Sequence, residues 1–131
     1  MFGNWQNNFY DQQMIENVKR IEAIIPNNKM SLVISAIENA GIMGITVMDS
    51  RGRGKGTRPL VRSSRGTKMQ LAEYNNLITV ITIVEDSKVE GVVSAILDAA
   101  CTGTTSDGKI FVSSVDEIID IQTGQRGKDA L

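Results

Sequence analysis

The sequence predicts an α+β domain in which strands and helices follow the order β-α-β-loop-β-α-β. Strand-like apolar stretches open and close the folded part of the chain, at 18–25 and 109–112. Between them lie two segments whose apolar residues recur at helical spacing, and a long basic stretch rich in glycine separates the two halves. This order is the ferredoxin-like arrangement, in which two helices cover one face of an antiparallel sheet.

The first half begins with a strand at 18–25, which Pro26 ends. Asn28 is the expected N-cap of the helix that follows, and Gly41 stands where a C′ glycine belongs. The apolar stripe of this helix consists of Met30, Val33, Ile34, Ile37 and Ala40. A second strand is predicted at 42–50, directly before the basic stretch.

The second half starts with an unbroken apolar run at 77–84, which is typical of an inner strand covered on both faces. Ser87 and Glu90 have the spacing of a capping box, with Ser87 as the N-cap. The stripe of the helix that follows consists of Val89, Val92, Val93, Ile96, Leu97 and Ala100. This helix should end near Cys101, which we expect to be a small core residue.

The two ends of the chain are predicted to differ. A strand at 109–112 and a shorter one at 118–121 should precede a polar tail that begins at Gly124. Residues 1–17 are rich in Asn and Gln, and we expect them to be an extension outside the domain, which spans 18–131. The extension is either a flexible tail or an arm whose aromatic side chains dock on the domain or on a neighbouring subunit.

The basic stretch 51–68 is the most unusual part of the sequence. Its basic residues are Arg51, Arg53, Lys55, Arg58, Arg62, Arg65 and Lys68, and it contains no acidic residue. Because neither helical nor strand periodicity is present, we expect a loop of about 51–73 to project between two strands of the sheet. The rest of the chain is acidic, so the loop indicates an anionic or carbonyl-rich target.

Composition excludes several classes of function. The chain has no histidine, which rules out histidine-based acid–base chemistry and histidine-ligated metals. Its one cysteine allows no internal disulfide and fits a reducing compartment. No apolar run approaches the ~18 residues of a membrane span, and no signal-peptide pattern is present, so we expect a cytoplasmic protein. With 41% hydrophobic residues and one sheet face without helices, the domain should form oligomers.

Three segments are candidates for binding. The loop entry 52–56 can bring backbone amides close to an anion, with Lys55 as a point charge, or it can be a flexible hinge. The turn 104–109 offers hydroxyls, amides and a lysine to a phosphate, or it simply connects a helix to a strand. The distal loop 58–68 either contacts a partner or is a solvated tip. No catalytic or metal-binding constellation is recognisable, so we do not expect an enzyme.

These segments resemble the PII nitrogen-regulatory signalling proteins over about 19–127. The similar residues are KRIEAII in the first strand, AIENAGIMGITVMDSRGRG before the loop, and TGTTSDGKIFVSSVDEIIDIQTGQRG near the end. The resemblance implies a homotrimer with adenine-nucleotide sites between subunits. It also implies long loops, the T-loops, that bind a transporter or a metabolic enzyme. Contact with a membrane is expected only through a channel partner.

The resemblance also implies roles for individual residues. Those expected on the adenine side of the nucleotide are Ile24, Gly44, Ile45 and Thr46. Those expected to contact its phosphates are Gly52, Gly54, Lys55, Gly108 and Lys109. The T-loop residues expected to bind a partner are Arg58, Arg62, Arg65 and Lys68.

Three departures from the family pattern affect the ligand. Gly56 replaces a glutamine used for Mg²⁺ and 2-oxoglutarate, and an apolar residue near Leu77 replaces the lysine that holds 2-oxoglutarate, so neither ligand is expected. The segment 119–124 reads IDIQTG and lacks two phosphate-binding arginines. Among ATP, ADP and AMP, the less charged nucleotides are therefore favoured unless Arg126 or Lys128 compensates.

Other functions are compatible with the same order of elements. A divergent PII-like protein can regulate carbon, bicarbonate or other transport and sense AMP, ADP or a small anion. A single-stranded nucleic-acid-binding domain shares this order, but it needs aromatics on its central strands, where only Phe111 is present, so we expect no nucleic acid. A small phosphate-handling enzyme would need a nucleophile or base that the sequence does not reveal.

Overall fold

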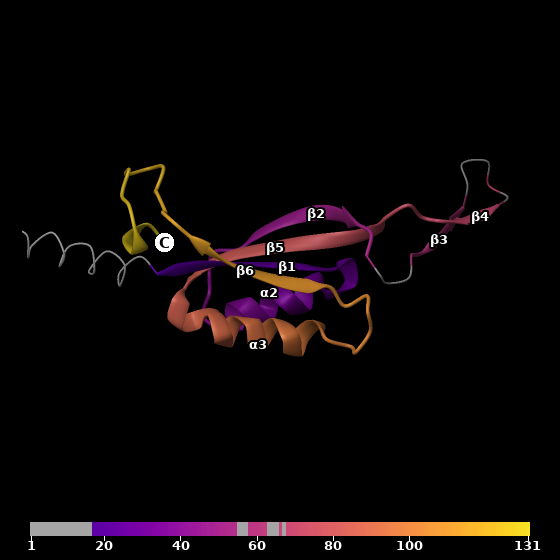
Figure 1. Ribbon diagram of the computed structural model, residues 1–131, viewed down its shortest axis with the longest axis horizontal. Helices are drawn as coiled ribbons and strands as arrows, with labels where there is room; N and C mark the ends of the chain where they lie inside the picture. Colours follow the sequence, from indigo (N-terminus) through magenta and orange to yellow (C-terminus); the bar gives the residue numbers. More distant parts are fainter. Residues whose placement is uncertain (1–16, 55–57, 63–65, 67) are drawn as a thin grey trace, which may run out of the picture.

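The structure is a computed structural model that describes residues 17–54, 58–62, 66 and 68–131. Figure 1 shows a four-stranded antiparallel sheet with two α-helices on one face. The strands lie in the order β2-β5-β1-β6, and the main body follows the chain order β1-α2-β2-β5-α3-β6. This is the predicted ferredoxin-like α+β fold.

Two long strands, β1 (Val18–Pro26) and β5 (Asn75–Glu85), form the centre of the sheet and pair along their whole length. β5 is an inner strand, as predicted, and Val80 points into the core with 1% of its surface exposed. Ile81 and Ile83 on the other face are only partly buried. The helices therefore cover β5 on one face, and the prediction that both faces are covered is wrong for the single chain.

The helices α2 (Met30–Asn39) and α3 (Val89–Ala100) pack on the sheet and on each other. Most of their predicted apolar stripes are buried or partly buried, but Ala40 and Leu97 are exposed. Cys101 is also exposed, because α3 ends at the preceding residue and the backbone becomes extended there. The prediction that Cys101 belongs to the core is therefore wrong.

Each helix begins after a single 3₁₀ turn, Asn27–Lys29 before α2 and Asp86–Lys88 before α3. The predicted side-chain caps are wrong, because Asn28 and Ser87 lie inside these turns and neither helix has a side-chain cap hydrogen bond. The predicted end of α2 is correct: Gly41 has a φ of +89°, the left-handed conformation that glycine adopts at no steric cost.

The edge strand β2 (Thr46–Gly52) starts and ends later than the predicted strand at 42–50. Ile42 is buried in the hydrophobic core. The Thr82 hydroxyl donates a 2.7 Å hydrogen bond to the carbonyl of Gly44. The segment 42–45 is therefore a connection from the helix layer to the sheet edge, and pairing begins only after it.

The loop between β2 and β5 projects from one end of the sheet (Figure 1), as predicted. It contains a short antiparallel ribbon, β3 (Leu60–Arg62) paired with β4 (Met69–Leu71). The sequence did not reveal this ribbon, because a strand of three residues is too short to display a period. Within the described part of the loop, Arg51 and Gly52 belong to the end of β2 and not to the loop itself.

The opposite edge strand, β6 (Lys109–Val115), is longer than predicted. The shorter strand predicted after it is reduced to one isolated bridge between Ile119 and Arg126. The chain beyond Gly124 does not extend as a tail but folds back, ending in the 3₁₀ turn Lys128–Ala130. Both predictions for this segment are therefore wrong.

The face of the sheet that carries no helix, here called the open face, mixes apolar and charged side chains. Residues that pair directly across strands share a face, and the pairing places on the open face Arg20, Glu22, Ile24, Thr46, Met48, Leu77, Thr79, Ile81, Ile83, Lys109 and Phe111. Phe111 is 51% exposed there. Among the residues that the structure describes, no helix is long and apolar enough to cross a membrane.

Candidate functional site

The projecting loop is closed at its neck by two arginines that meet one carbonyl oxygen. Arg53 Nε donates a 2.7 Å hydrogen bond to Glu73 O, and Arg58 Nη1 donates to the same oxygen at 3.4 Å. The Arg53 guanidinium also lies 5.2 Å from the centre of the Tyr74 ring, within cation–π range. These contacts join the outgoing and returning segments of the loop. We call them the neck clasp.

A cleft of about 440 Å³ lies between the loop neck and the turn that follows α3. Its lining combines residues from four separate segments: Pro26, Arg58, Pro59, Asn75, Asn76, Leu77 and Ser106. Gly52, one of the residues predicted to contact phosphates, pairs with Asn75 of this lining. We call this the loop-end cleft.

The turn at Gly108 brings the second group of predicted phosphate residues to the same end of the sheet. Gly108 has a φ of +107°, and a Cβ atom on it would lie 2.0 Å from the carbonyl oxygen of Ile24. Only glycine fits there without a backbone shift. Lys109 pairs directly with Ile24 across β6 and β1. The structure therefore places Ile24, Gly108 and Lys109 together, near the loop-end cleft.

Part of the predicted phosphate cradle is filled by the chain itself. The Asp107 carboxylate accepts hydrogen bonds from the backbone amides of Thr102 at 2.7 Å, Gly103 at 2.9 Å and Thr104 at 3.2 Å. The hydroxyls of Thr102 and Thr104 also donate to it. The Thr102 hydroxyl, followed by these amides, lowers the pKa of Asp107 to about 2. Thr104 and Asp107 are therefore already engaged with each other, whereas Ser106 of the same predicted cradle lines the loop-end cleft.

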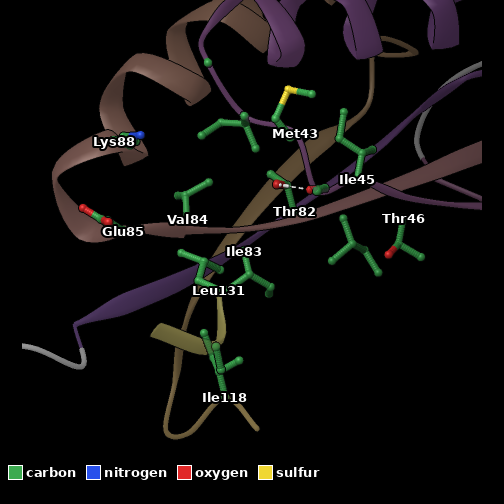
Figure 2. A pocket seen from close by; sticks show the side chains of 15 residues that line it. Met43, Ile45, Thr46, Thr82, Ile83, Val84, Glu85, Lys88, Ile118 and Leu131 are labelled. Atoms are coloured by element: carbon green, nitrogen blue, oxygen red, sulfur yellow. Dashed lines mark hydrogen bonds between the residues drawn. The ribbon is translucent and has the colours of Figure 1, made fainter. Parts of the chain in front are cut away.

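A second cleft, of about 540 Å³, lies beside the connection between α2 and β2 (Figure 2). Three of the four residues predicted on the adenine side, Gly44, Ile45 and Thr46, line it, whereas the fourth, Ile24, lies beside Lys109 near the loop-end cleft. Ile118 and the C-terminal Leu131 reach it from the folded-back end of the chain, and Figure 2 shows both on one side of the cleft. We call this the adenine-side cleft.

The two clefts do not meet within one chain. Thr46 lies on β2, one edge of the sheet, whereas Lys109 lies on β6, the other edge. β5 and β1 separate them, which corresponds to roughly 14 Å at ordinary strand spacing. The structure thus brings the predicted nucleotide-binding residues into two groups, and no single cleft of the described chain contains both.

The two cations that were expected to compensate for missing arginines are engaged elsewhere. Arg126 forms an ion pair with Glu117, and Lys128 Nζ lies 3.5 Å from Glu85 Oε1. The IDIQTG segment before them forms a turn in which Asp120 accepts amide hydrogen bonds, among them one of 2.8 Å from Gln122. In this conformation the C-terminal segment offers no unpaired cation to a phosphate near 119–128.

Leu77 confirms the apolar character of the loop base. Its side chain packs on Gly52, where an added Cβ would lie 2.6 Å from Leu77 Cδ1. Leu77 also lines the loop-end cleft. An apolar side chain at this point provides no partner for the carboxylate of a 2-oxo acid.

Some predicted residues occupy surfaces, and others cannot be placed. Arg62 and Lys68 are exposed on or beside the ribbon. Gly54 is exposed, with no atom within 4 Å of a Cβ built on it. Lys55 and Arg65 lie outside the described residues. Their predicted roles remain predictions.

Sequence reasoning missed several residues of these clefts. Asn75 and Asn76 line the loop-end cleft, although they were assigned to no binding role. Asp107 was included only as part of a turn, although an Asp that follows Thr-Gly-Thr within five residues is a recognisable acceptor for turn amides. Leu131 could not have been found, because nothing in the sequence indicated that the end of the chain folds back.

The fold is a ferredoxin-like sheet with a long loop that projects between two of its strands. The family described as Nitrogen regulatory protein P-II matches residues 18–125. The chain is 39% identical over 116 residues to the Nitrogen regulatory protein P-II of Mesorhizobium japonicum and 40% identical to that of Azospirillum brasilense. In both cases the match covers 87% of this chain and 100% of the relative. The chain belongs to the P-II family.

A solved structure agrees with this assignment. The crystal structure of Arabidopsis thaliana PII bound to citrate has a TM-score of 0.70 with this chain and is 31% identical in sequence. The match covers 88% of this chain and 94% of the plant protein. P-II proteins are signalling regulators and not enzymes, so the predictions of a PII-type regulator and of a non-enzymatic protein are confirmed.

Proposed function

We propose that this P-II protein binds an adenine nucleotide between neighbouring copies of a homotrimer. The observation that carries the proposal is the separation of the predicted site into two groups: Gly44, Ile45 and Thr46 line the adenine-side cleft, whereas Ile24, Gly108 and Lys109 lie together on the other side of the sheet's centre. A ligand that contacts both groups needs the adenine-side cleft of one copy and the loop-end cleft of another. Contacts between two different surfaces generate closed rings when the rotation closes, and the open face of the sheet would be buried inside such a ring.

AMP and ADP are the nucleotides that fit this chain best. Arg126 and Lys128 are held in ion pairs with Glu117 and Glu85, so in this conformation they do not replace the two arginines that the phosphate side lacks, and Asp107 adds a carboxylate beside it. A charge-assisted hydrogen bond contributes roughly 1.5–3 kcal/mol, so each lost cation should weaken the binding of a triphosphate. 2-Oxoglutarate is not part of the proposal, because Leu77 provides no partner for its carboxylate. Mg²⁺ is left out because Gly56 stands where the family pattern has the glutamine used for this ion.

The regulated partner contacts the T-loop, which projects away from the sheet (Figure 1). A transporter or a metabolic enzyme in the cytoplasm is the class of partner that we propose, and the nucleotide would change the position of the loop through the cleft at its neck. Arg58 supports this link, because it lines the loop-end cleft and also forms part of the neck clasp.

Isothermal titration of the full chain with AMP, ADP and ATP tests the proposal. We expect saturable binding of AMP or ADP that is tighter than binding of ATP. The Lys109→Gln variant should bind about ten-fold more weakly, because it loses one charged hydrogen bond. Lys19→Gln is the matched control, since Lys19 donates to Ser114 at the far end of the same strand pair. An absence of binding for all three nucleotides would contradict the proposal.

A further inference from the structure

The ribbon in the T-loop carries an apolar strip on one face. Leu60 pairs with Leu71 and Arg62 pairs with Met69, and residues that pair directly share a face. Leu60, Leu71 and Met69 therefore lie together, with 62%, 55% and 57% of their surfaces exposed. The other face of the ribbon carries the pair Val61 and Gln70.

The strip lies at the outer end of the loop, far from the hydrophobic core. Figure 1 shows the ribbon projecting from the end of the sheet, away from both helices. The neck clasp lies between the ribbon and the sheet, and Ala72 donates a 2.9 Å hydrogen bond to Pro59 O just above it. The strip is therefore held away from the core of its own chain.

The basic residues that the structure describes between β2 and β5 divide into two groups. Arg53 and Arg58 point inward to Glu73 and hold the neck. Arg62 lies on the face of the apolar strip, and Lys68 is exposed immediately before β4. A surface that meets the strip consequently also meets these two cations.

An isolated two-stranded ribbon is marginally stable in water. Exposed leucines on it do not stabilise it, because apolar surface lowers the free energy only when it is removed from water. Clustered exposed apolar side chains with polar neighbours are typical of a protein contact surface. We propose that the apolar strip docks in an apolar groove of the regulated protein, and that carboxylates on the rim of this groove meet Arg62 and Lys68. The proposal deepens the proposed function, since it specifies the partner surface that the T-loop recognises.

Two other classes of target fit less well. Interfacial membrane binding favours a broad apolar face with Trp or Phe, and the loop 51–73 contains no aromatic residue. Single-stranded nucleic acid needs aromatic side chains on which bases stack. Tyr74, the nearest aromatic, lies at the neck beside Arg53 and not on the strip.

Site-specific photo-crosslinking of the full chain, carried out in the cells that naturally make this protein, tests the proposal. A benzophenone amino acid at Leu71 probes the strip, and the same amino acid at Gln70 probes the opposite face of the ribbon. We expect the Leu71 position to give at least ten-fold more adduct with one protein than the Gln70 position. Mass spectrometry should place the crosslink in an apolar segment that is flanked by Asp or Glu.

Variants in the same chain show whether the strip itself is responsible. Leu60→Ser should reduce the adduct at least ten-fold, Leu60→Met should restore it, and Val61→Ser on the opposite face should leave it unchanged. Equal adducts from both faces, no adduct from either, or adducts only with another copy of the chain would overturn the proposal. The proposal would also be overturned if the chain bound phosphatidylglycerol vesicles or single-stranded RNA and Leu60→Ser abolished that binding.

The nucleotide titration separates this proposal from the proposed function. Leu60→Ser should bind AMP and ADP like the unmodified chain, because the strip lies outside both clefts. If the unmodified chain binds no adenylate while the strip still crosslinks as expected, nucleotide sensing fails and the docking surface stands. If adenylates bind but the crosslinks do not depend on the strip, the docking surface fails alone.

Discussion

The two faces of the main sheet differ in how they are completed. On the helix-covered face, Ile21 and Val80 of the sheet and Ile37 and Ile96 of the helices are each 1% exposed. On the open face, Phe111 is 51% exposed, and Arg20 and Glu22 form an ion pair of 3.4 Å. The chain therefore buries one face of the sheet with its own helices. The other face keeps exposed apolar side chains, which are typical of a surface that contacts further copies.

This difference indicates which properties depend on one chain and which on an assembly. Substitutions on the covered face should change the stability of the chain at every protein concentration. Substitutions on the open face should change assembly and, through it, nucleotide binding. The predictions below test this division, beginning with the largest expected effect.

Ile37→Ala is the strongest test of the covered face. It removes a fully buried side chain between α2 and the sheet, and such changes cost about 2–5 kcal/mol because a cavity remains. Urea unfolding followed by circular dichroism measures the loss. Ser35→Ala on the exposed side of the same helix is the control, with an expected change below about 0.5 kcal/mol. A change below about 1 kcal/mol for Ile37→Ala would contradict the core described here.

Gly108→Ala tests the contact between the turn and β1. The new methyl group would lie 2.0 Å from the Ile24 carbonyl oxygen. Strain of the positive φ alone costs about 1–3 kcal/mol, so the total loss of stability should be larger, and AMP binding should weaken with it. Gly103→Ala is the matched control: it has a φ of +83° but open space around its Cβ. Equal losses for the two variants, in unfolding or in titration, would show that the close approach is unimportant.

Phe111→Asp tests the open face. Because the side chain is half exposed, the monomer should lose only about 0.5 kcal/mol or less, but burying a carboxylate between copies should abolish the trimer. Sedimentation velocity measures the mass. Val112→Asp is the control, since Val112 is the next residue of β6, points to the other face and is 47% exposed. A Phe111→Asp protein that still forms a trimer would place the subunit contact elsewhere.

Protonation of Asp107 should have the smallest effect on stability among these tests. Its pKa is lowered from 3.8 to about 2, so it binds protons more weakly in the folded chain than in the unfolded chain. Its stabilising effect on the turn is therefore complete above about pH 4 and is lost as the pH falls through about 2. The carboxyl carbon chemical shift should titrate with a midpoint near 2, and Asp107→Asn should speed hydrogen exchange of the Gly103 amide at neutral pH. A midpoint near 4 would mean that the amides do not hold the carboxylate.

Much of the fold could be predicted, because hydrophobic periodicity reports burial directly. Val33 and Ile37 of α2, and Val92 and Ile96 of α3, recur at helical spacing and are all buried. The long basic loop was also predictable from its missing periodicity. Gly41 was identified because a positive φ at the end of a helix favours glycine.

Two of the errors lie where tertiary contacts decide the structure. The start of β2 depends on the hydrogen bond from Thr82 to Gly44, which joins residues far apart in the sequence. The folded-back end of the chain depends on Gly127, whose amide donates to Ile118 O at 3.0 Å. Local patterns contain neither contact. The division of the site between two clefts follows from the strand order, which a list of motifs does not give.

The most direct test of a site shared between copies is a mixing experiment with two variants that each impair a different half of the site. Gly44→Trp blocks the adenine-side cleft, and Lys109→Gln weakens the phosphate side. Co-expressed and purified through a different tag on each variant, the mixed trimers should recover AMP binding at about a third of their sites, because one of the three interfaces in each mixed ring joins two intact halves. Each variant alone should bind poorly. Mixed assemblies that bind no better than either variant would contradict a nucleotide site built from two copies.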